Sequence, residues 1–168
     1  SEAQEIGAVN TIKIENGKLT GYNTDHFGFE NSLKPHLKSH HKRALILGTG
    51  GASKAVAFAL KKLDIHFEYV SRTPSSGVKY SYESLAIEGI ENYQIIINCT
   101  PLGTFPEIHK CPTIPYEHIT SNHLLFDLIY NPEETLFLKH GKAKNATTLN
   151  GLEMLRLQAE KSWEIWNS

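Results

Sequence analysis

Apolar and polar residues follow two different patterns along the chain, and the change falls near residue 43. In the first part, residues 6–14 have the pattern of a strand, and residues 19–22 have the pattern of a second one. The Asn16-Gly17 pair between them favours a tight turn, so an antiparallel hairpin is predicted. A helix is expected next, over residues 24–37.

In the second part, short apolar runs alternate with segments of helical periodicity. The predicted strands are residues 44–47, 67–70, 95–97, 124–126 and 144–147, and the predicted helices are residues 52–63, 133–140 and 151–166. Strands that are buried on both faces and separated by helices indicate a parallel sheet with right-handed crossovers. The predicted fold class is therefore α/β, with a doubly wound parallel sheet.

Composition excludes several classes of protein. The chain has 168 residues, of which 40% are hydrophobic and 21% are charged, and its net charge is −1. It lacks a run of the ~20 apolar residues that a membrane helix needs, and it lacks the basic surface that a nucleic-acid partner would require. Its two cysteines exclude a disulfide scaffold and a four-cysteine zinc site, so the cytoplasm is the default compartment. The only methionine is Met154, so we expect the chain to begin inside a longer gene product.

The strongest local motif is a glycine-rich turn that follows the first strand of the second part. It reads Gly48-Thr49-Gly50-Gly51-Ala52-Ser53 and opens a predicted helix. Gly48 would permit the tight turn, Gly50 would let backbone approach a pyrophosphate, and Ser53 is small enough for close packing of helix on strand. The anion would then rest on the helix N-terminus. This context predicts a Rossmann-type dinucleotide-binding domain, with a plain structural turn as the alternative.

The end of the next strand indicates which dinucleotide is bound. An NAD site usually has a carboxylate there, whereas this strand ends in Ser71-Arg72-Thr73. A guanidinium pairs with a phosphate and can stack on adenine, so NADP is the predicted cofactor. The alternative is that Arg72 is only a solvated loop residue.

Three further features have both a functional and a structural interpretation. Thr100, which follows the strand at residues 95–97, either lines the cofactor cleft or belongs to an ordinary turn. Asp25 is either a functional carboxylate or the cap of the helix that starts there. His36, His40 and His41 lie in a polar segment without partners at metal-ligand spacing, so no metal site is predicted.

Taken together, several stretches resemble the shikimate dehydrogenase family, in the family's order and over nearly the whole chain. They are Gly7-Ala8-Val9-Asn10-Thr11, Gly21-Tyr22-Asn23-Thr24-Asp25, Gly48 to Ser53, Ser71-Arg72-Thr73, and residues 98–103, 127–132 and 150–158. The first, second and last of these are specific to the family. Enzymes of this family reduce 3-dehydroshikimate to shikimate with NADPH, in the pathway to aromatic amino acids.

The resemblance implies a role for particular residues. Asn10, Asp25, Tyr130 and Gln158 would bind the substrate, and Asp25 would also be the acidic member of a catalytic Lys–Asp pair. The cofactor would be held by Gly48, Thr49, Gly50, Gly51 and Ala52 at the pyrophosphate, by Ser71, Arg72 and Thr73 at the 2′-phosphate, and by Leu128 and Gly151 near the nicotinamide. A ketone reduced by hydride needs a proton as the alcohol forms, which explains why an acidic group is required.

The sequence departs from the family in ways that limit this expectation. The N-terminal substrate domain, with the catalytic lysine, has no counterpart, so no lysine of this chain is assigned that role. Ser71 stands where the family often has Asn, and Glu153 stands where Gly is common. We expect residues 1–23 to be a hairpin remnant of the substrate domain, and residues 24–168 to form the connecting helix, the NADP-binding domain and the closing helix.

The sequence therefore predicts the NADP-binding part of a shikimate dehydrogenase. The whole protein would catalyse the reversible reaction, and this chain alone would bind NADP(H) with little or no turnover. The alternatives are a quinate/shikimate dehydrogenase that also uses NAD, and a non-catalytic NADP-binding module. Apolar surface at Ile12, Phe27, Trp163 and Trp166 would promote self-association, as in a homodimer.

Overall fold

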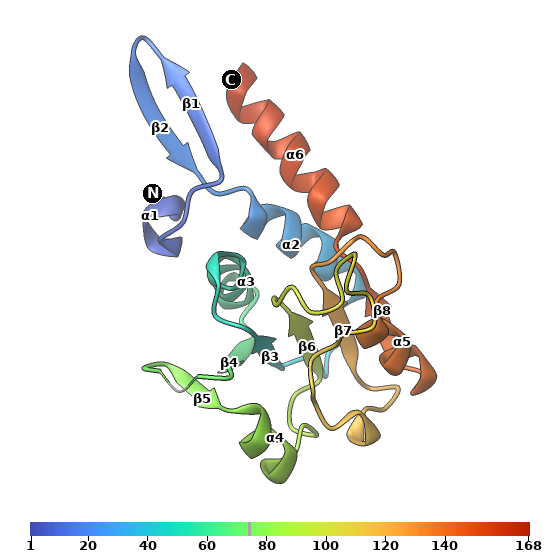
Figure 1. Ribbon diagram of the computed structural model, residues 1–168. Helices are drawn as coiled ribbons and strands as arrows, with labels where there is room; N and C mark the ends of the chain where they lie inside the picture. Colours follow the sequence, from blue (N-terminus) through green and yellow to red (C-terminus); the bar gives the residue numbers. More distant parts are fainter. Residues whose placement is uncertain (74) are drawn as a thin grey trace.

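The computed structural model describes residues 1–73 and 75–168, and its centre is a six-stranded parallel sheet with helices on both faces (Figure 1). The strands are β3 (Arg43–Leu47), β4 (His66–Val70), β5 (Val78–Tyr80), β6 (Ile95–Asn98), β7 (Leu124–Asp127) and β8 (Thr147–Leu149). Their order across the sheet is β5-β4-β3-β6-β7-β8. The chain thus winds outward from β3 and then returns to start again at β6 on its other side, which confirms the doubly wound, Rossmann-type fold.

The remaining elements surround this sheet or project from it. They are α1 (Glu2–Ile6), β1 (Thr11–Glu15), β2 (Lys18–Tyr22), α2 (Asp25–Leu33), α3 (Gly51–Lys62), α4 (Tyr82–Glu88), α5 (Leu136–Ala143) and α6 (Leu152–Asn167), with 3₁₀ turns at Lys34–His36 and Tyr116–His118. Strands β1 and β2 form a separate antiparallel hairpin that extends beside α6 (Figure 1). Within the described residues, no helix is long and apolar enough to cross a membrane.

Alternate residues of the central strands pack into two separate cores, one on each face of the sheet. In β3, Ala44 and Ile46 belong to the core under α2, α3 and α6, whereas Leu45 and Leu47 belong to the opposite core. All four side chains are fully buried. This burial on both faces explains why the sequence of β3 is apolar without interruption.

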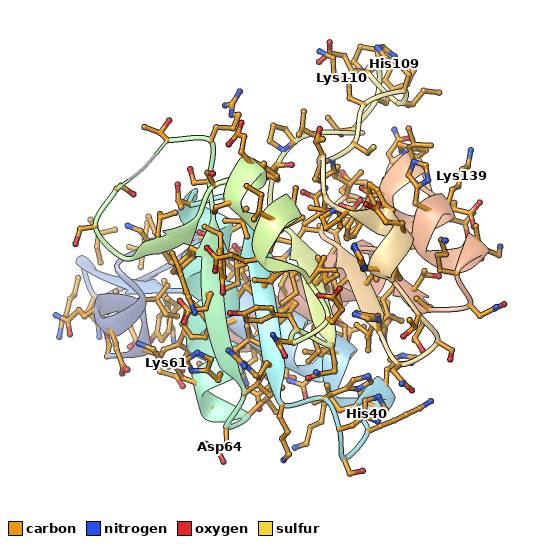
Figure 2. The ribbon with its side chains drawn as sticks, turned by 90° about the horizontal axis from the view of Figure 1, so that it is seen from below. His40, Lys61, Asp64, His109, Lys110 and Lys139 are labelled. Atoms are coloured by element: carbon orange, nitrogen blue, oxygen red, sulfur yellow. The ribbon has the colours of Figure 1, made fainter. Side chains whose placement is uncertain are left out.

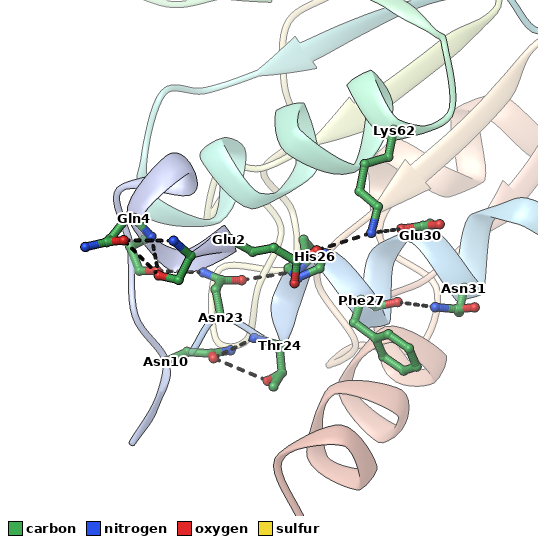
Figure 3. A network of polar contacts seen from close by, with 12 residues as sticks. Glu2, Gln4, Asn10, Asn23, Thr24, His26, Phe27, Glu30, Asn31 and Lys62 are labelled. Carbon is green, nitrogen blue, oxygen red and sulfur yellow. Dashed lines mark hydrogen bonds and ion pairs between the residues drawn. The ribbon is translucent and has the colours of Figure 1, made fainter. Parts of the chain in front are cut away.

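The prediction of one strand over residues 6–14 is wrong for its first half. Residues 2–6 form α1, whose first turn is closed by a capping box between Ser1 and Gln4. The helix ends at Gly7, which has φ +70°. Glu2 fastens α1 to the domain, because its carboxylate lies 3.4 Å from Nε2 of His26 and 3.5 Å from Nζ of Lys62 (Figure 3).

Other differences concern the ends of elements and one unit that was not predicted. Helix α2 ends at Leu33 and continues as a 3₁₀ turn, because Pro35 has no N–H to donate. Helix α5 begins only at Leu136, where the Thr135 hydroxyl accepts from the N–H of Leu138. Strand β8 lies at Thr147–Leu149 instead of 144–147. Strand β5 and helix α4 were not predicted, since they are short.

Helices α2 and α6 cross in close contact at Gly28. A Cβ atom at Gly28 would lie 2.5 Å from the carbonyl oxygen of Met154 and 3.1 Å from Cβ of Gln158. Such a distance from backbone is too short for a real Cβ, so only glycine permits this approach. The contact brings α6 beside the start of α2, to which the hairpin also leads (Figure 1).

Candidate functional site

A cavity of about 310 Å³ lies where the strand order reverses, between the carboxyl ends of β3 and β6. Ligands of open α/β sheets bind at this switch point. The cavity is lined by Gly48, Thr49, Gly50, Ser71, Arg72, Tyr82, Cys99, Thr100, Pro101 and Leu102. The loop that carries His109 and Lys110 projects from the same end of the sheet, opposite to His40 and Asp64 (Figure 2). The structure therefore brings together the predicted glycine turn, the Ser71-Arg72 pair and Thr100.

The glycines of the turn serve different needs. Gly48 has φ +99°, a conformation that favours glycine, and a Cβ there would also crowd Cγ2 of Thr100 at 3.0 Å. Gly50 and Gly51 have ordinary φ values, and a Cβ on either would meet nothing within 4 Å. Nothing in the chain itself requires glycine at these two positions, as expected if they face a ligand. Ser53 is buried and donates from Oγ to the Gly50 carbonyl at 2.6 Å, which fixes the start of α3.

Arg72 is exposed at the rim of the cavity, two residues after the end of β4. Its neighbour Ser71 is held by a bond from its N–H to the Tyr80 carbonyl of β5 at 3.1 Å. Ser71 Oγ accepts from the N–H of Thr73 at 3.3 Å. Tyr82 also lines the cavity, and burial raises the pKa of its hydroxyl while the nearby Arg72 charge acts against that effect. The sequence did not identify Tyr82, because it is one tyrosine among seven without a motif around it.

A buried chain of hydrogen bonds fixes the loops at the ends of β6 and β7. Thr100 Oγ1 donates to Asn98 Oδ1 at 2.6 Å, and Asn98 Nδ2 donates to Asp127 Oδ1 at 3.1 Å. The other carboxylate oxygen accepts from Thr135 Oγ1 at 2.6 Å. Burial raises the pKa of Asp127 to about 6, although these donors act against it. Burial also raises the pKa of the Cys99 thiol, with a further contribution from Asp127, so Cys99 stays protonated and packs as an apolar residue.

Leu128 and Gly151, which are both predicted to lie near the nicotinamide, are in contact just beyond the end of β7. The N–H of Gly151 donates to the Ile129 carbonyl at 3.0 Å. A Cβ at Gly151 would lie 1.9 Å from the carbonyl oxygen of Leu128. The start of α6 is thus packed directly against the loop that leaves β7.

A second polar group gathers at the start of α2, where the hairpin joins the helix (Figure 3). Asn10 Nδ2 donates to Asp25 Oδ1 at 2.8 Å, and Asn10 Oδ1 accepts from the N–H of Thr24 at 2.8 Å. Burial raises the pKa of the Asp25 carboxyl, and the bond from Asn10 and the proximity of His26 act against it. Asp25 is the first residue of the helix, and the oxygen that accepts from the first turn belongs to Asn23, at 3.3 Å from the N of His26. The Asp25 carboxylate therefore does not cap α2, and its functional role stays a prediction.

Gln158 joins this group, whereas the contacts of Tyr130 do not reach it. Gln158 Oε1 accepts from Thr24 Oγ1 at 3.2 Å. Tyr130 is 50% exposed and stands at the end of β7, near Leu128. The structure therefore brings together three of the four predicted substrate-binding side chains.

Two of the three histidines considered as metal ligands, His40 and His41, have hydrogen-bonding partners within the chain. His40 Nε2 lies 3.0 Å from the carbonyl oxygen of Asn122, and His41 Nδ1 accepts from the N–H of Lys38 at 3.0 Å. Across residues 1–73 and 75–168, no group of three His, Cys, Asp or Glu side chains is placed to hold a metal ion.

Comparisons with known proteins agree with this geometry. Shikimate dehydrogenase (NADP(+)) of Methanococcus maripaludis is 43% identical over 180 residues, which cover 98% of this chain and 64% of that protein. A crystal structure of a shikimate dehydrogenase in complex with NADP⁺ superposes with a TM-score of 0.84, at 38% identity, over 99% of this chain and 63% of the other. The chain is homologous to the shikimate dehydrogenases. The resemblance predicted from the sequence is thus confirmed.

The chain spans a little under two thirds of the length of these shikimate dehydrogenases. A quinate dehydrogenase of Corynebacterium glutamicum, solved in complex with NAD, also has a similar fold, with a TM-score of 0.85 at 26% identity. It is covered to 64% of its length, and 98% of this chain is matched. No model of a known protein family matches the sequence.

Proposed function

We propose that this chain is the NADP-binding part of an oxidoreductase that interconverts 3-dehydroshikimate and shikimate. The observation that carries the proposal is the cavity at the switch point, which the glycine turn and Arg72 line together. The relatives support it, because one is named shikimate dehydrogenase (NADP(+)) and another shikimate dehydrogenase was solved in complex with NADP⁺. As a part of such an enzyme, the chain alone would bind the dinucleotide and turn over little or no substrate.

The residues around the cavity fit a dinucleotide with a 2′-phosphate. Gly50 and Gly51 leave open space at the start of α3, where unpaired N–H groups and the helix dipole favour a pyrophosphate. Thr49 and Ala52 complete this turn. Arg72, with Ser71 and Thr73, would hold the 2′-phosphate, since a guanidinium binds phosphate through several donors at once. Thr100, Leu128 and Gly151 would face the nicotinamide half.

The second polar group would bind and orient the substrate. When bound, NADPH supplies the hydride, and the protein contributes position and electrostatics. Asn10 and Gln158 would accept or donate hydrogen bonds to substrate hydroxyls, with Tyr130 closing the site from the end of β7. Asp25 would hold the proton-donating partner in place, because its half-buried carboxylate can pair with a cation or a substrate hydroxyl. None of the lysines in this sequence is assigned the role of that partner.

A calorimetric titration of the chain with NADP⁺ and with NAD⁺ tests the cofactor assignment. We expect NADP⁺ to bind more tightly, and we expect Arg72→Ala to weaken NADP⁺ binding by about 10-fold or more while it changes NAD⁺ binding little. Arg156→Ala is the matched control, since Arg156 is exposed on α6 and pairs with Glu153 and Glu160. A folded chain that binds neither dinucleotide would contradict the proposal.

The two alternative functions predict different results, in this titration and in activity measurements on the longer protein. Equal affinity for NAD⁺ and NADP⁺, together with oxidation of quinate by the longer protein, would favour a quinate-type enzyme such as the NAD-bound structure above. Asp25→Asn in the longer protein separates an enzyme from a non-catalytic NADP-binding module. A loss of shikimate oxidation with unchanged NADP⁺ binding is expected for the enzyme, and no oxidation by either protein is expected for the module.

The division of the chain at residues 23 and 24 and its self-association belong to the same proposal. The hairpin, with Ile12 54% exposed, and α6, with Trp163 67% and Trp166 52% exposed, present apolar side chains side by side. Phe27 is half-buried, so it contributes less exposed apolar surface than predicted. Trp166 Nε1 donates to the Ile12 carbonyl at 2.9 Å, which joins the two elements. We expect the chain to form a homodimer through this surface. Analytical sedimentation of the wild-type chain and of Trp163→Lys tests this, because the variant should dimerise less.

A further inference from the structure

The side-chain amide of Asn98, at the end of β6, is completely buried and has a partner for each of its donors and acceptors. Its Oδ1 accepts from the N–H of Thr100 at 3.0 Å and from Thr100 Oγ1 at 2.6 Å. Its Nδ2 donates to Asp127 Oδ1 at 3.1 Å and, less closely, to the Leu102 carbonyl at 3.4 Å. An amide has two lone pairs on oxygen and two protons on nitrogen, so this arrangement uses all four.

The neighbours of Asn98 permit only one orientation of this amide. The backbone N–H of Thr100 can only donate, and it lies at the oxygen end. The Leu102 carbonyl and the ionised Asp127 carboxylate can only accept, and they lie at the nitrogen end. A rotated amide would place donors against donors at one end and oxygens against oxygens at the other, which is costly in a buried position. The direction of the Asn98 side chain is therefore fixed.

Asp127 continues this connection into the loop that leaves β7. The same Oδ1 that accepts from Asn98 also accepts from the N–H of Ile129 at 3.1 Å. The Ile129 carbonyl in turn accepts from the N–H of Gly151, at the start of α6. The main chain adds a bond from the N–H of Leu128 to the carbonyl of Asn98 at 3.1 Å. Two buried side chains, 29 positions apart, thus join the loop after β6 to the loop after β7.

These two loops form the two walls between which the dinucleotide is proposed to lie. Thr100 and Leu102, in the loop after β6, line the cavity beside the glycine turn. Leu128, in the loop after β7, lies with Gly151 where the nicotinamide half is placed in the proposed function. Asn98 and Asp127 are fully buried and do not line the cavity. They can therefore act on a bound cofactor only through the spacing of the two walls.

We propose that Asn98 is a positioning residue that, together with Asp127, sets the spacing of the two walls and so lets both halves of the dinucleotide bind at once. The inference rests on the proposed function, in which this chain binds NADP⁺. When one half of a ligand is bound, the other half binds as if at a high local concentration, provided that both subsites are within reach together. A fixed spacing preserves this gain in affinity, and walls that move independently lose part of it.

Calorimetry of this chain with NADP⁺ and with adenosine 2′,5′-bisphosphate tests the inference. The bisphosphate has only the adenosine half of the cofactor, so it needs Arg72 and the glycine turn but not the wall after β7. We expect Asn98→Ala to weaken NADP⁺ binding by about 10-fold and to change bisphosphate binding by less than about 2-fold. Equal losses for the two ligands, or unchanged NADP⁺ binding in a folded variant, would overturn the proposal.

Variants of Asp127 test the same connection from its other end. Asp127→Ala removes the acceptor shared by Asn98 and Ile129, so we expect the same selective loss of NADP⁺ affinity. Asp127→Asn keeps an oxygen that can accept from both, and the Thr135 hydroxyl can turn to accept from the new amide, so most of the affinity should return. An affinity as low in Asp127→Asn as in Asp127→Ala would contradict the connection. If neither alanine variant folds, Asn98→Ser, which leaves a smaller gap, replaces them with the same expectation.

The matched control is His123→Ala, at the opposite end of β7. His123 is also buried, and its Nδ1 fixes a turn by accepting from the N–H of Thr120 at 3.0 Å. Its loss should lower the stability of the chain without changing the affinity for either ligand, because His123 precedes the strand and the cavity lies beyond its carboxyl end. A loss of NADP⁺ affinity as large as that in Asn98→Ala would mean that destabilisation alone explains the effect, and the proposal would fail.

Amide hydrogen exchange of the chain without ligand separates this inference from the proposed function. Asp127→Ala should speed exchange at the N–H of Ile129, which loses its acceptor, and also at the N–H of Thr100, because Asn98 is no longer held. Unchanged exchange at Thr100 would show that the walls are not joined, even in a chain that binds NADP⁺. A wild-type chain that binds neither NADP⁺ nor the bisphosphate contradicts the proposed function, and the exchange rates then still decide whether the walls are joined.

Discussion

The side-chain amide of Asn10 donates to the carboxylate of Asp25 at 2.8 Å, across the junction between the hairpin and α2. The opposite end of the same amide accepts from the N–H of Thr24, so its orientation is fixed by the backbone. The half-buried Asp25 carboxylate is stabilised in its charged form by this fixed donor, whereas burial itself favours the neutral form. The state of Asp25 therefore depends on the balance of these two effects, and burial is the larger one.

Asn10→Ala should raise the pKa of Asp25 further above its usual value. The substitution removes the hydrogen bond that favours the carboxylate and leaves the burial in place. The pKa is measured by following the carboxyl carbon resonance of Asp25 against pH, with Asn31→Ala as a control on the exposed part of α2, where Asn31 donates to Phe27. A pKa that falls in Asn10→Ala would show that the amide does not stabilise the charge.

Asp127 should make the fold less stable as pH rises between about 4 and 6. Its pKa is about 6 in the folded chain and about 3.9 when unfolded, so the folded state binds the proton more tightly in this interval. The contribution is complete below about pH 3.9 and is lost by about pH 6, with a magnitude of at most roughly 3 kcal/mol. Asp127→Asn should abolish this slope. Urea unfolding of both proteins from pH 4 to 7 measures it, and parallel curves would contradict the assignment.

His41 and His123 should have the opposite effect on stability. In each, Nδ1 accepts from a backbone N–H three residues earlier, at 3.0 Å from Lys38 and from Thr120. A protonated ring cannot accept there, and burial lowers the pKa of both side chains below 6.5. Their contribution is therefore present above pH 6.5 and is lost as pH falls below it toward the lowered folded value.

The two histidines can be tested by replacement with an acceptor that does not titrate. In His123→Asn, Oδ1 can take the place of Nδ1, so the variant should lose less stability than the wild type between pH 7 and pH 5. His109→Asn, in an exposed loop, is the control. An equal loss of stability in all three proteins would exclude a role for His123 in acid unfolding.

The sheet and its cofactor edge could be predicted because their signals are local. Buried parallel strands are continuous apolar runs, as at residues 44–47 and 95–97, and the glycine turn follows the first of them directly. The structure confirms their order and places the turn beside Thr100 at the switch point. Helix α1 escaped prediction because it has only five residues and depends on its cap at Ser1.

The part of the site that could not be predicted depends on contacts between distant residues. Thr24 and Ser162 are 138 positions apart, and neither lies in a pattern that distinguishes it from a surface hydroxyl. Their contact exists because Gly28 lets α6 approach α2, which is a property of the packed fold. Tyr82 likewise reaches the cavity only through the position of α4.

Gly151→Ala should destabilise the chain strongly. The added methyl would lie 1.9 Å from the carbonyl oxygen of Leu128, which is backbone and cannot turn aside as a side chain can. Overpacking of this kind typically costs about 1–3 kcal/mol, and the start of α6 would have to shift. Thermal or urea unfolding measures the loss. A variant as stable as the wild type would mean that the loop after β7 moves freely.

Gly50→Ala is the counterpart at a glycine whose Cβ position is open, and it should separate stability from binding. Its backbone conformation suits any residue and nothing lies within 4 Å of the added methyl, so unfolding should change by less than about 0.5 kcal/mol. The same methyl would occupy the approach to the α3 N-terminus, where the pyrophosphate is proposed to lie. We therefore expect NADP⁺ affinity to fall by about 10-fold, or about 1.4 kcal/mol, in the calorimetric titration. Unchanged affinity in a stable Gly50→Ala chain would place the pyrophosphate elsewhere, because a dinucleotide bound against this turn would collide with the methyl group.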